Sequence, residues 1–377
     1  MESGQDRLRV CQLITELVPG GAERCVYELA RRLDPRRFDV RVAALRGGAV
    51  ADWLAEAGVP VHVLDLRWRL DVRKLWQLAG LLREHRVELL HTHLFHADLA
   101  GRLAAGMAGV PHLVHTVHTV EARFRPWQYA FARLTSGRAD RIVCVSESAR
   151  RAHARRSGLG PQHYQVIHNG VDVKAFAPQP QQRERLRREW GIRDDQPLAA
   201  YVGRLDYEKG TDLLMSAVAQ LGARQSPAAV VIAGDGPMNP VVRNFIEHGE
   251  GGSGCRYLGF VQDVRPLLWA ADMLVMPSRW EGFGLAAAEA MAAGLPVVGT
   301  RIAGLSDVVV DKQTGLLVEP GDPTALAEAI LVLGRDADLR HRLGQAGMDR
   351  VAQRFTIEAN IAAHERLYEQ IAPSKHA

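Results

Sequence analysis

Short apolar runs recur along the chain, and longer stretches with a helical spacing of apolar residues separate them. Such runs, bounded by glycine, proline or polar residues, are typical of buried strands. In the first half of the chain they fall at 8–17, 39–45, 59–64, 87–91, 113–117 and 141–145. In the second half they fall at 198–202, 229–233, 256–261, 273–277, 296–300 and 315–318. Strands that alternate with helices predict an α/β fold with parallel sheets covered on both faces, which bind ligands at the carboxyl ends of their strands.

The length of the chain and one polar segment predict two domains. At 377 residues the chain is too long for a single hydrophobic core. A run rich in proline and glutamine at 177–182 indicates a linker. A linker at this point would divide the chain into two domains of ordinary size.

Composition and sequence termini exclude several classes of protein. The hydrophobic fraction of 47% and the charged fraction of 24% are typical of a globular protein. The first residues lack the basic and apolar regions of a signal peptide, and no apolar run approaches a membrane span, which predicts a cytoplasmic location. The four cysteines show no C-x-x-C spacing, so neither a zinc site nor a disulfide framework is indicated.

Charge is divided unevenly between the two halves. Residues 1–180 hold 26 Lys and Arg against 18 Asp and Glu, a balance of +8, and the remainder holds 21 against 25, a balance of −4. A basic first half predicts a negatively charged partner. An anionic membrane surface or a phosphate-bearing acceptor fits this better than a nucleic acid, because no nucleic-acid-binding signature is present.

Two stretches in the basic half, 67–86 and 123–141, mix aromatic and leucine residues with arginines. Basic amphipathic segments of this kind can lie on anionic lipid, which would place the protein peripherally on the inner face of the membrane. The alternative is ordinary helix amphipathicity, with the apolar stripe buried in the core. The sequence leaves both interpretations open.

Residues 279–300 form the most distinctive stretch, R-W-E-G-F-G-L-A-A-A-E-A-M-A-A-G-L-P-V-V-G-T. The pattern predicts a loop, a helix and a short buried strand. Gly282 and Gly284 let the loop turn sharply and approach a ligand closely. The segment 285–293 consists of strong helix formers, and the glycine and proline that follow end the helix.

Two carboxylates punctuate this stretch. Glu281 lies in the glycine-flanked loop, and Glu289 lies eight positions later, on the same helix face as Leu285. The backbone N–H groups at Gly284 and Leu285 would have no intrahelical partners and would form a site for an anion, with Glu289 beside it. This arrangement suits a phosphorylated ligand that carries hydroxyl groups. An isolated Glu is more often a solvated residue, but the surrounding alanines and glycines argue against that interpretation.

The pattern E-G-F-G-L-x-x-x-E-A-M-A-x-G-x-P-V at 281–297 resembles the signature of the retaining family 4 glycosyltransferases. The resemblance implies the GT-B fold, in which two Rossmann-like domains face each other across a cleft and the last helix, here 357–371, crosses back to the first domain. N-G-V-D at 169–172 resembles the segment that closes the first domain in this family. We therefore expect an acceptor domain over 1–175 plus 357–377 and a nucleotide-sugar donor domain over 176–356.

A second motif, G-R-L-x-x-x-K-G at 203–210, also matches the family. Arg204 and Lys209 place two positive charges near the end of a predicted strand. A departing diphosphate needs such neutralisation, although the same residues would be unremarkable as solvated loop cations. The resemblance further implies that the backbone at Val261 faces the nucleotide base.

Glycines and histidines follow the predicted strands of the first half. Gly20 and Gly21 connect a strand to a helix, a unit that presents backbone N–H groups to a diphosphate. The absence of G-x-G-x-x-G there argues against a nicotinamide enzyme. We interpret His91 and His115 as structural, whereas His118 matches the active-site histidine of the family, and the resemblance implies that it hydrogen-bonds the transferred sugar.

Together these motifs predict a retaining, metal-independent hexosyltransferase without a cofactor. It would move a sugar from a nucleotide diphosphate sugar, UDP-sugar in preference to GDP-sugar, to a hydroxyl acceptor. A lipid-linked molecule is one candidate for the acceptor, and the expected pathway is cell-surface polysaccharide or glycolipid synthesis. A literal D-x-D at 336–338 is interpreted as chance, because it lies far from the glycine loops. The predicted catalytic residues are Glu281, His118, Arg204 and Lys209. The predicted substrate-binding residues are Gly20, Gly21, Arg204, Lys209, Val261, Glu281, Gly282, Phe283, Gly284, Leu285 and Glu289.

Two other functions stay open at this point. A sugar-nucleotide epimerase could share the fold and the donor pocket, and it would release free nucleotide without any acceptor. A non-catalytic nucleotide-sugar-binding protein is the other alternative, although the loss of catalysis usually leaves the charged set incomplete. A phosphorylase that uses pyridoxal phosphate is disfavoured by the modest length of the chain.

Overall fold

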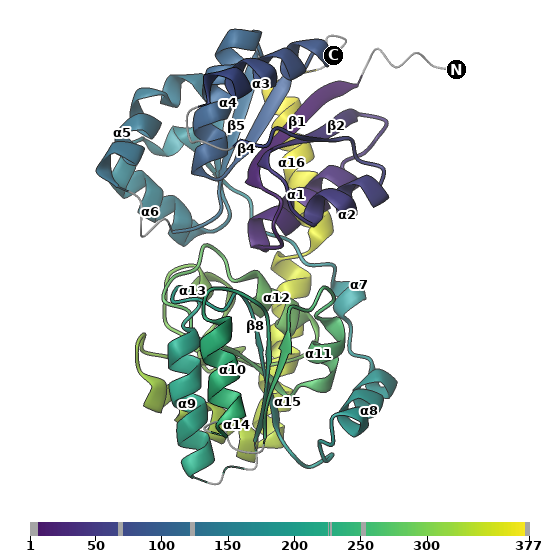
Figure 1. The fold of residues 1–377 in the computed structure, drawn as a ribbon, viewed down its shortest axis with the longest axis vertical. Coiled ribbons are helices and arrows are strands. Elements are labelled where there is room, and N and C mark those ends of the chain that lie inside the picture. Colours follow the sequence, from purple (N-terminus) through teal and green to yellow (C-terminus); the bar gives the residue numbers. More distant parts are fainter. Residues whose placement is uncertain are drawn as a thin grey trace. The chain divides into compact units, whose positions relative to one another are not determined.

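The computed structural model describes residues 7–66, 71–120, 125–224, 226, 228–249 and 254–373. They belong to two compact units, an N-terminal unit of residues 1–170 and 358–377 and a C-terminal unit of residues 171–357 (Figure 1). Parts of the predicted membrane-contact stretches, 67–70 and 123–124, lie outside the described residues.

The N-terminal unit contains a parallel sheet of seven strands in the order β3-β2-β1-β4-β5-β6-β7. The strands are β1 Leu8–Glu16, β2 Phe38–Arg46, β3 Val61–Val63, β4 Leu89–His93, β5 His112–Val117, β6 Arg141–Cys144 and β7 Tyr164–Val166. The α-helices of this unit are α1 Gly21–Arg32, α2 Val50–Glu56, α3 Val72–Glu84, α4 Phe95–Ala108, α5 Pro126–Leu134, α6 Glu147–Ser157 and α16 Ile357–Ile371. The strand order reverses between β1 and β4, the point at which such sheets open a crevice for ligands.

Alternate positions of β1 serve opposite faces of this sheet. Leu13 is buried in a core with residues of α3 and α4, whereas Ile14 is buried in a core with residues of α1 and α2. The face that carries Ile14 also carries Gln12, whose side chain donates to Tyr368 Oη of α16 at 3.0 Å. Helix α16 follows the C-terminal unit in sequence yet packs beside β1, as the resemblance predicts (Figure 1).

The C-terminal unit contains a second parallel sheet, of six strands in the order β10-β9-β8-β11-β12-β13. The strands are β8 Leu198–Val202, β9 Ala229–Ala233, β10 Cys255–Gly259, β11 Met273–Met276, β12 Val297–Thr300 and β13 Gly315–Val318. The helices are α7 Val173–Phe176, α8 Pro180–Glu189, α9 Thr211–Ala223, α10 Asn239–Glu247, α11 Arg265–Ala270, α12 Leu285–Ala292, α13 Leu305–Val308, α14 Pro323–Arg335 and α15 Ala337–Arg354. This order reverses between β8 and β11, so each unit has the doubly wound arrangement.

The chain passes from one unit to the other at Gly170 and Val171. The backbone N–H of Val171 donates to the carbonyl of Phe355, so the first and last segments of the C-terminal unit meet there. Residues 177–182, indicated as a linker by composition, lie within this unit, and Pro180 begins α8. A proline is well placed there because the first helical residue needs no N–H partner.

None of the helices in the described ranges is long and apolar enough to cross a bilayer. Helix α3 buries Leu78 and Leu82 in the core, as an ordinary amphipathic helix does, and leaves Trp76 exposed. Helix α5 leaves Trp127 and Leu134 exposed.

Candidate active site

The turn after β8 carries both cations of the G-R-L-x-x-x-K-G motif. Asp206 organises this turn, because one carboxylate oxygen accepts from Arg204 Nε at 2.6 Å and the other accepts from the backbone N–H of Lys209 at 2.8 Å. Arg204 also contacts Glu208 at 3.4 Å, and its side chain is 58% exposed. The guanidinium is therefore held by two carboxylates of its own turn and stays accessible to solvent.

The loop after β11 carries Glu281 to the place between β8 and β11 where the strand order reverses, the switch point of this sheet. Its Oε1 lies 2.7 Å from Lys209 Nζ and accepts from the Ser278 hydroxyl at 2.9 Å. Thr300, at the end of β12, donates in turn to the Ser278 carbonyl. Glu281 is only 7% exposed. The structure thus brings Lys209 and Glu281, 72 positions apart in sequence, into direct contact at the crevice between β8 and β11.

Arg279 ties these two loops together. Its guanidinium makes two 2.7 Å contacts with Asp212 of α9 and lies 3.7 Å from the centre of the Tyr207 ring. Its backbone N–H donates to the Glu208 carbonyl at 2.8 Å. The Arg279 guanidinium lowers the pKa of Asp212, mainly through this hydrogen bonding. Two loops that begin on different strands are therefore held in one arrangement.

Two glycines permit this close approach. Gly210 has φ +68°, and a Cβ on it would lie 2.0 Å from the Pro277 carbonyl oxygen, so only glycine fits between the two loops. Gly284 precedes α12 with φ +89°, a left-handed conformation that lets the loop turn into the helix. Gly282 is buried and does not have a positive φ, so the sharp turn predicted for both glycines falls on Gly284 alone.

Helix α12 begins at Leu285 without a side-chain cap. The first N–H groups of a helix have no intrahelical partners and favour an anion. Glu289 lies within α12 and is 6% exposed. Phe283 is buried and packs edge-on against Phe355, with ring centres 5.2 Å apart, so its side chain belongs to the core and only its backbone can serve a ligand.

The other predicted contacts lie on other loops. Val261 follows β10, the edge strand two positions from β8 in the sheet, so it lies farther along the carboxyl edge than Lys209. Gly20 and Gly21 belong to the N-terminal unit, where Gly20 caps α1 and its carbonyl accepts from Arg24.

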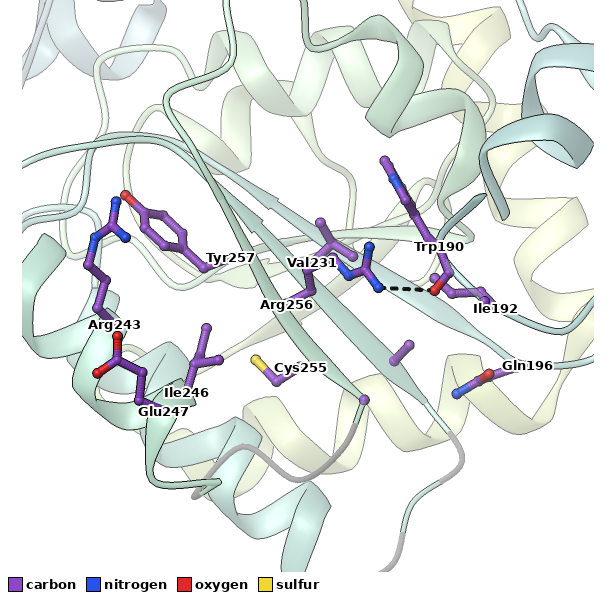
Figure 2. A pocket seen from close by; sticks show the side chains of 13 residues that line it. Trp190, Ile192, Gln196, Val231, Arg243, Ile246, Glu247, Cys255, Arg256 and Tyr257 are labelled. Atoms are coloured by element: carbon purple, nitrogen blue, oxygen red, sulfur yellow. Dashed lines mark hydrogen bonds between the residues drawn. The ribbon is translucent and has the colours of Figure 1, made fainter. Parts of the chain in front are cut away.

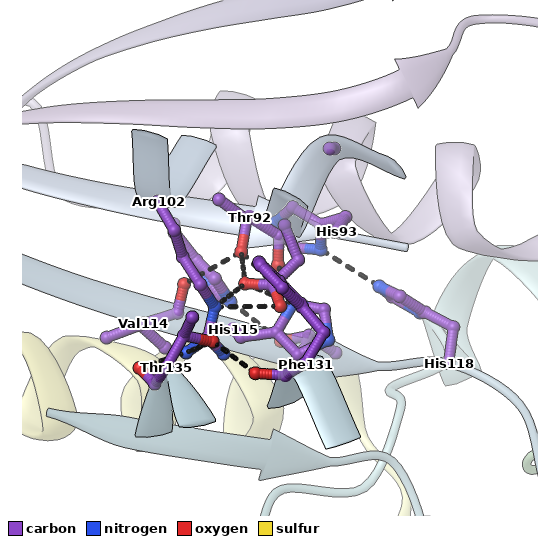
Figure 3. A network of polar contacts seen from close by, with 12 residues as sticks. Thr92, His93, Arg102, Val114, His115, His118, Phe131 and Thr135 are labelled. Carbon is purple, nitrogen blue, oxygen red and sulfur yellow. Dashed lines mark hydrogen bonds and ion pairs between the residues drawn. The ribbon is translucent and has the colours of Figure 1, made fainter. Parts of the chain in front are cut away.

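His118 follows β5 in the N-terminal unit and is half-buried. Its Nε2 lies 2.9 Å from His93 Nδ1 (Figure 3). Burial, together with the charges of His115 and His364, lowers the pKa of His118 to about 3. The imidazole is therefore neutral at physiological pH and can serve as a hydrogen-bonding group but not as a cation.

A separate buried network lies beside this pair in Figure 3. Arg102 donates to both oxygens of Asp98 at 2.9 Å and to the Thr135 carbonyl at 2.7 Å. Asp98 also accepts from the Thr92 hydroxyl, and His115 lies 3.5 Å away. These side chains fasten α4 to neighbouring segments, consistent with the structural interpretation of His115.

A cavity of about 390 Å³ opens at the other end of the second sheet (Figure 2). It is lined by the first residues of β9 and β10, by Trp190 and by residues of α10. Arg243 lies over the Tyr257 ring at 5.1 Å, and burial raises the pKa of Cys255 to about 11. None of the predicted site residues lines this cavity, so the carboxyl edge remains the candidate site.

Family models match both halves of the chain. Glycosyltransferase Family 4 matches residues 19–175, and Glycosyl transferases group 1 matches residues 182–350. A D-inositol 3-phosphate glycosyltransferase of Jonesia denitrificans is 32% identical over 93% of this chain and 91% of its own length. The chain belongs to the family 4 glycosyltransferases.

Other proteins similar to this glycosyltransferase match it over all or nearly all of its length. The UDP-Gal:alpha-D-GlcNAc-diphosphoundecaprenol alpha-1,3-galactosyltransferase of Escherichia coli is 25% identical over 100% of both chains. The structure of Anabaena HepE in complex with UDP and glucose superposes with a TM-score of 0.87 over 97% of this chain and 100% of that one, at 22% identity. The glycosyltransferase has the GT-B fold.

Neither the role of Arg279 nor the partners of His118 were predicted from the sequence. Arg279 opens the distinctive 279–300 stretch, but its role depends on Tyr207 and Asp212, which lie about 70 positions earlier. Gln12 and His93 did carry a signal, because each interrupts or ends an apolar strand with a polar side chain. A polar residue at a buried strand position needs a hydrogen-bond partner, so such positions indicate a buried hydrogen-bond network.

Proposed function

We propose that this glycosyltransferase moves a hexose-type sugar from a nucleoside diphosphate sugar to a hydroxyl acceptor, with the anomeric configuration retained and without a metal ion. The contact between Lys209 Nζ and Glu281 Oε1, 2.7 Å apart at the switch point, carries the proposal. It places a cation, which a departing diphosphate requires, beside a carboxylate, which suits sugar hydroxyls.

The donor would bind the C-terminal unit. Arg204, Lys209 and the start of α12 at Gly284 and Leu285 neutralise the diphosphate in this proposal. The Lys209 ammonium has three N–H groups, and Glu281 occupies one, so two can face phosphate oxygens. The Arg204 side chain is 58% exposed and can be reached by the same ligand.

The remaining site residues have separate roles in this proposal. Glu281 holds the sugar, Glu289 accepts hydrogen bonds from the ribose, and Val261 contacts the base through its backbone. His118 of the N-terminal unit hydrogen-bonds the transferred sugar. The set is completed by backbone contacts to the phosphates and the acceptor from Gly20, Gly21, Gly282 and Phe283.

The proposed reaction is a front-face displacement. The acceptor oxygen forms a bond to the anomeric carbon while the bond from that carbon to the diphosphate oxygen breaks. The acceptor proton passes to a phosphate oxygen of the departing nucleotide, so no protein side chain must become a nucleophile. Lys209 and Arg204 stabilise the negative charge that develops on the diphosphate.

The names of relatives guide the finer assignment. The Escherichia coli relative is named for UDP-galactose and a diphosphoundecaprenol acceptor, and HepE was solved with UDP and glucose. They favour a UDP-sugar over a GDP-sugar, and a lipid-linked acceptor in cell-surface polysaccharide or glycolipid synthesis.

A lipid-linked acceptor also favours peripheral contact with the cytoplasmic face of the membrane. Trp127 and Leu134 are exposed on α5, which also carries the exposed basic side chain of Arg133. Sedimentation with vesicles that contain anionic lipid tests this contact, and a protein that stays in the supernatant at low salt would contradict it.

The catalytic proposal is tested with purified protein and a panel of nucleotide sugars. Thermal shift identifies the donor, because a ligand that binds only the folded state raises the melting temperature. The chosen donor is then incubated with polyprenyl-diphosphate sugar acceptors and EDTA, and the anomeric configuration of the product is read by NMR. We expect retention. An inverted product, or nucleotide release at the same rate without acceptor, would contradict the proposal, and the second outcome would favour an epimerase.

A further inference from the structure

A row of polar side chains crosses one face of the N-terminal sheet. Gln12 of β1 is paired in register with His91 of β4, and His93 of β4 with Thr116 of β5. Alternate strand residues share a face, so these four side chains lie on the same side of the sheet. None is more than 3% exposed. A row of this kind in a dry core must be fully hydrogen-bonded.

The row continues as one chain of hydrogen bonds that ends at His118. His118 Nε2 lies 2.9 Å from His93 Nδ1, and His93 Nε2 lies 2.8 Å from Gln12 Oε1. The Gln12 amide then donates to Tyr368 Oη at 3.0 Å. Tyr368 Oη lies 2.6 Å from His91 Nδ1, and the other nitrogen of His91 lies 2.6 Å from the Thr116 hydroxyl.

The histidines of this chain are neutral. Burial is the main cause that lowers the pKa of His91 and of His93 well below the usual value, and neighbouring histidines lower both further. Among the described residues no carboxylate contacts either ring, so no counter-charge offsets burial. Each imidazole therefore carries one N–H and offers one bare nitrogen.

The orientation of the Gln12 amide, with its nitrogen towards Tyr368 Oη and its oxygen towards His93, sets the direction of each bond. Gln12 Oε1 can only accept, so His93 must carry its proton on Nε2. His93 Nδ1 is then bare and accepts, so the proton between the two histidines belongs to His118 Nε2. With that proton placed, Nδ1 of His118 is bare, and among the described residues it has no hydrogen-bond partner.

We propose that Gln12 and His93 are positioning residues that hold His118 in the tautomer protonated on Nε2. His118 then offers Nδ1 as a hydrogen-bond acceptor to a hydroxyl of the transferred sugar. The contact with sugar rests on the function proposed above, whereas the tautomer is a property of the free protein. Tyr368 extends the control to α16, because its hydroxyl accepts from the amide end of Gln12.

The tautomer is measured by NMR on protein labelled with ¹⁵N-histidine, without ligand. Long-range ring correlations distinguish a protonated from a bare nitrogen, and the His118 signal is assigned by its loss in His118→Gln. We expect a bare Nδ1 and a protonated Nε2 in His118. A protonated Nδ1 with a bare Nε2 would overturn the proposal, whatever the enzyme transfers.

Two variants identify the residue that sets the direction of the hydrogen bond between His93 and His118. Gln12→Met keeps the length of the side chain but removes both the acceptor and the donor, so His118 should become a mixture of tautomers. Thr116→Val removes the far end of the chain and should leave the tautomer of His118 unchanged. His153, which pairs with Tyr164 away from this chain, is the internal control and should not change in either variant. An unchanged His118 in Gln12→Met would refute the role of Gln12.

The kinetic consequence is tested separately, once a donor and an acceptor are known. Gln12→Met should lower kcat roughly tenfold, the size expected for one hydrogen bond lost in the transition state, and leave KM for the donor close to the wild-type value. Thr116→Val should keep kcat near wild type. A raised KM for the donor with an unchanged kcat would show that Gln12 has only a structural role and would contradict the proposal. Should Gln12→Met fail to fold, the tautomer of the wild-type protein still decides the proposal.

Discussion

At the residue scale, the candidate site depends on which charges are paired before a ligand arrives. Lys209 is paired with Glu281, and Arg204 with Asp206 and Glu208. These pairs hold two long, flexible side chains near the switch point, so less side-chain entropy is lost when a diphosphate binds. The two cations differ in their surroundings, since Lys209 shares its carboxylate with the proposed sugar site.

The first prediction concerns these two cations. Arg204→Ala and Lys209→Ala should each lower turnover on the order of 10²-fold, because preorganised charge next to the leaving group is lost. The matched control is Lys174→Ala, which removes an exposed lysine of α7 in the same unit. Steady-state rates with the identified donor measure the effect. A near-normal rate in either site variant would refute its assignment to the diphosphate.

The second prediction separates the two carboxylates. Glu281→Gln should retain affinity for the free nucleoside diphosphate and lose transfer, because Glu281 is assigned to the sugar. Glu289→Ala should chiefly weaken the binding of the nucleotide, because Glu289 is assigned to the ribose. Calorimetry with the nucleoside diphosphate alone measures both affinities. The reverse pattern would exchange the two roles.

At the element scale, the site exists because the loops after β8 and β11 are neighbours. Consecutive strands of the chain do not place them side by side. The chain crosses over from β8 to β9 and from β9 to β10, and a third crossover returns β11 to the other edge of β8. Arg279 then fixes the two loops through Asp212, Tyr207 and the Glu208 carbonyl.

The third prediction concerns this link. Arg279→Leu should weaken nucleoside diphosphate binding roughly tenfold, because the two loops lose their fixed spacing. The control is Arg183→Leu, which removes a comparable ion pair with Asp272 at the opposite end of β11. Both variants should lower the melting temperature, but only Arg279→Leu should raise the dissociation constant. Equal dissociation constants for the two variants would show that the link is only structural.

At the scale of the whole molecule, the two units differ in their buried histidines. Among the described residues, the N-terminal unit has seven histidines whose pKa is lowered, in every case mainly by burial: His62, His91, His93, His115, His118, His153 and His364. The histidines of the C-terminal unit, His248 and His341, are exposed. Lowering the pH should therefore destabilise the N-terminal unit more than the C-terminal unit.

The fourth prediction follows from this difference. The pKa of His364 falls from 6.5 to about 4 on folding, so between these values the unfolded chain binds a proton that the folded chain does not. The contribution of His364 to the free energy of unfolding is fully present above pH 6.5. It falls as the pH drops towards 4, by about 3 kcal/mol for His364 alone. Hydrogen exchange, corrected for its intrinsic pH dependence, should show protection lost between pH 6.5 and 4.5 in the N-terminal unit first. Equal loss in both units would contradict the prediction.

Several elements were predictable because their signals are local. The strand 198–202, the turn motif at 203–210 and the helix that starts at Leu285 are each encoded by neighbouring residues, and all lie where the sequence predicts. β7 was not predicted, because three residues at a sheet edge, with a polar residue in the middle, carry too little periodicity. Phe283 was assigned to a ligand because the motif contains it, and only the position of Phe355 shows that its ring is buried.

The sequence by itself determined the fold class, the family and the loops that carry its chemistry, because apolar periodicity, glycine positions and motif spacing are all properties of short segments. Only the tertiary structure decided which partners those loops have. Lys209 meets Glu281, Arg279 holds Asp212, and Gln12 reaches His118 through His93 because strand order brings distant segments together. Spacing along the chain does not specify strand order, which is set by how the helices and the two faces of each sheet bury their apolar surface.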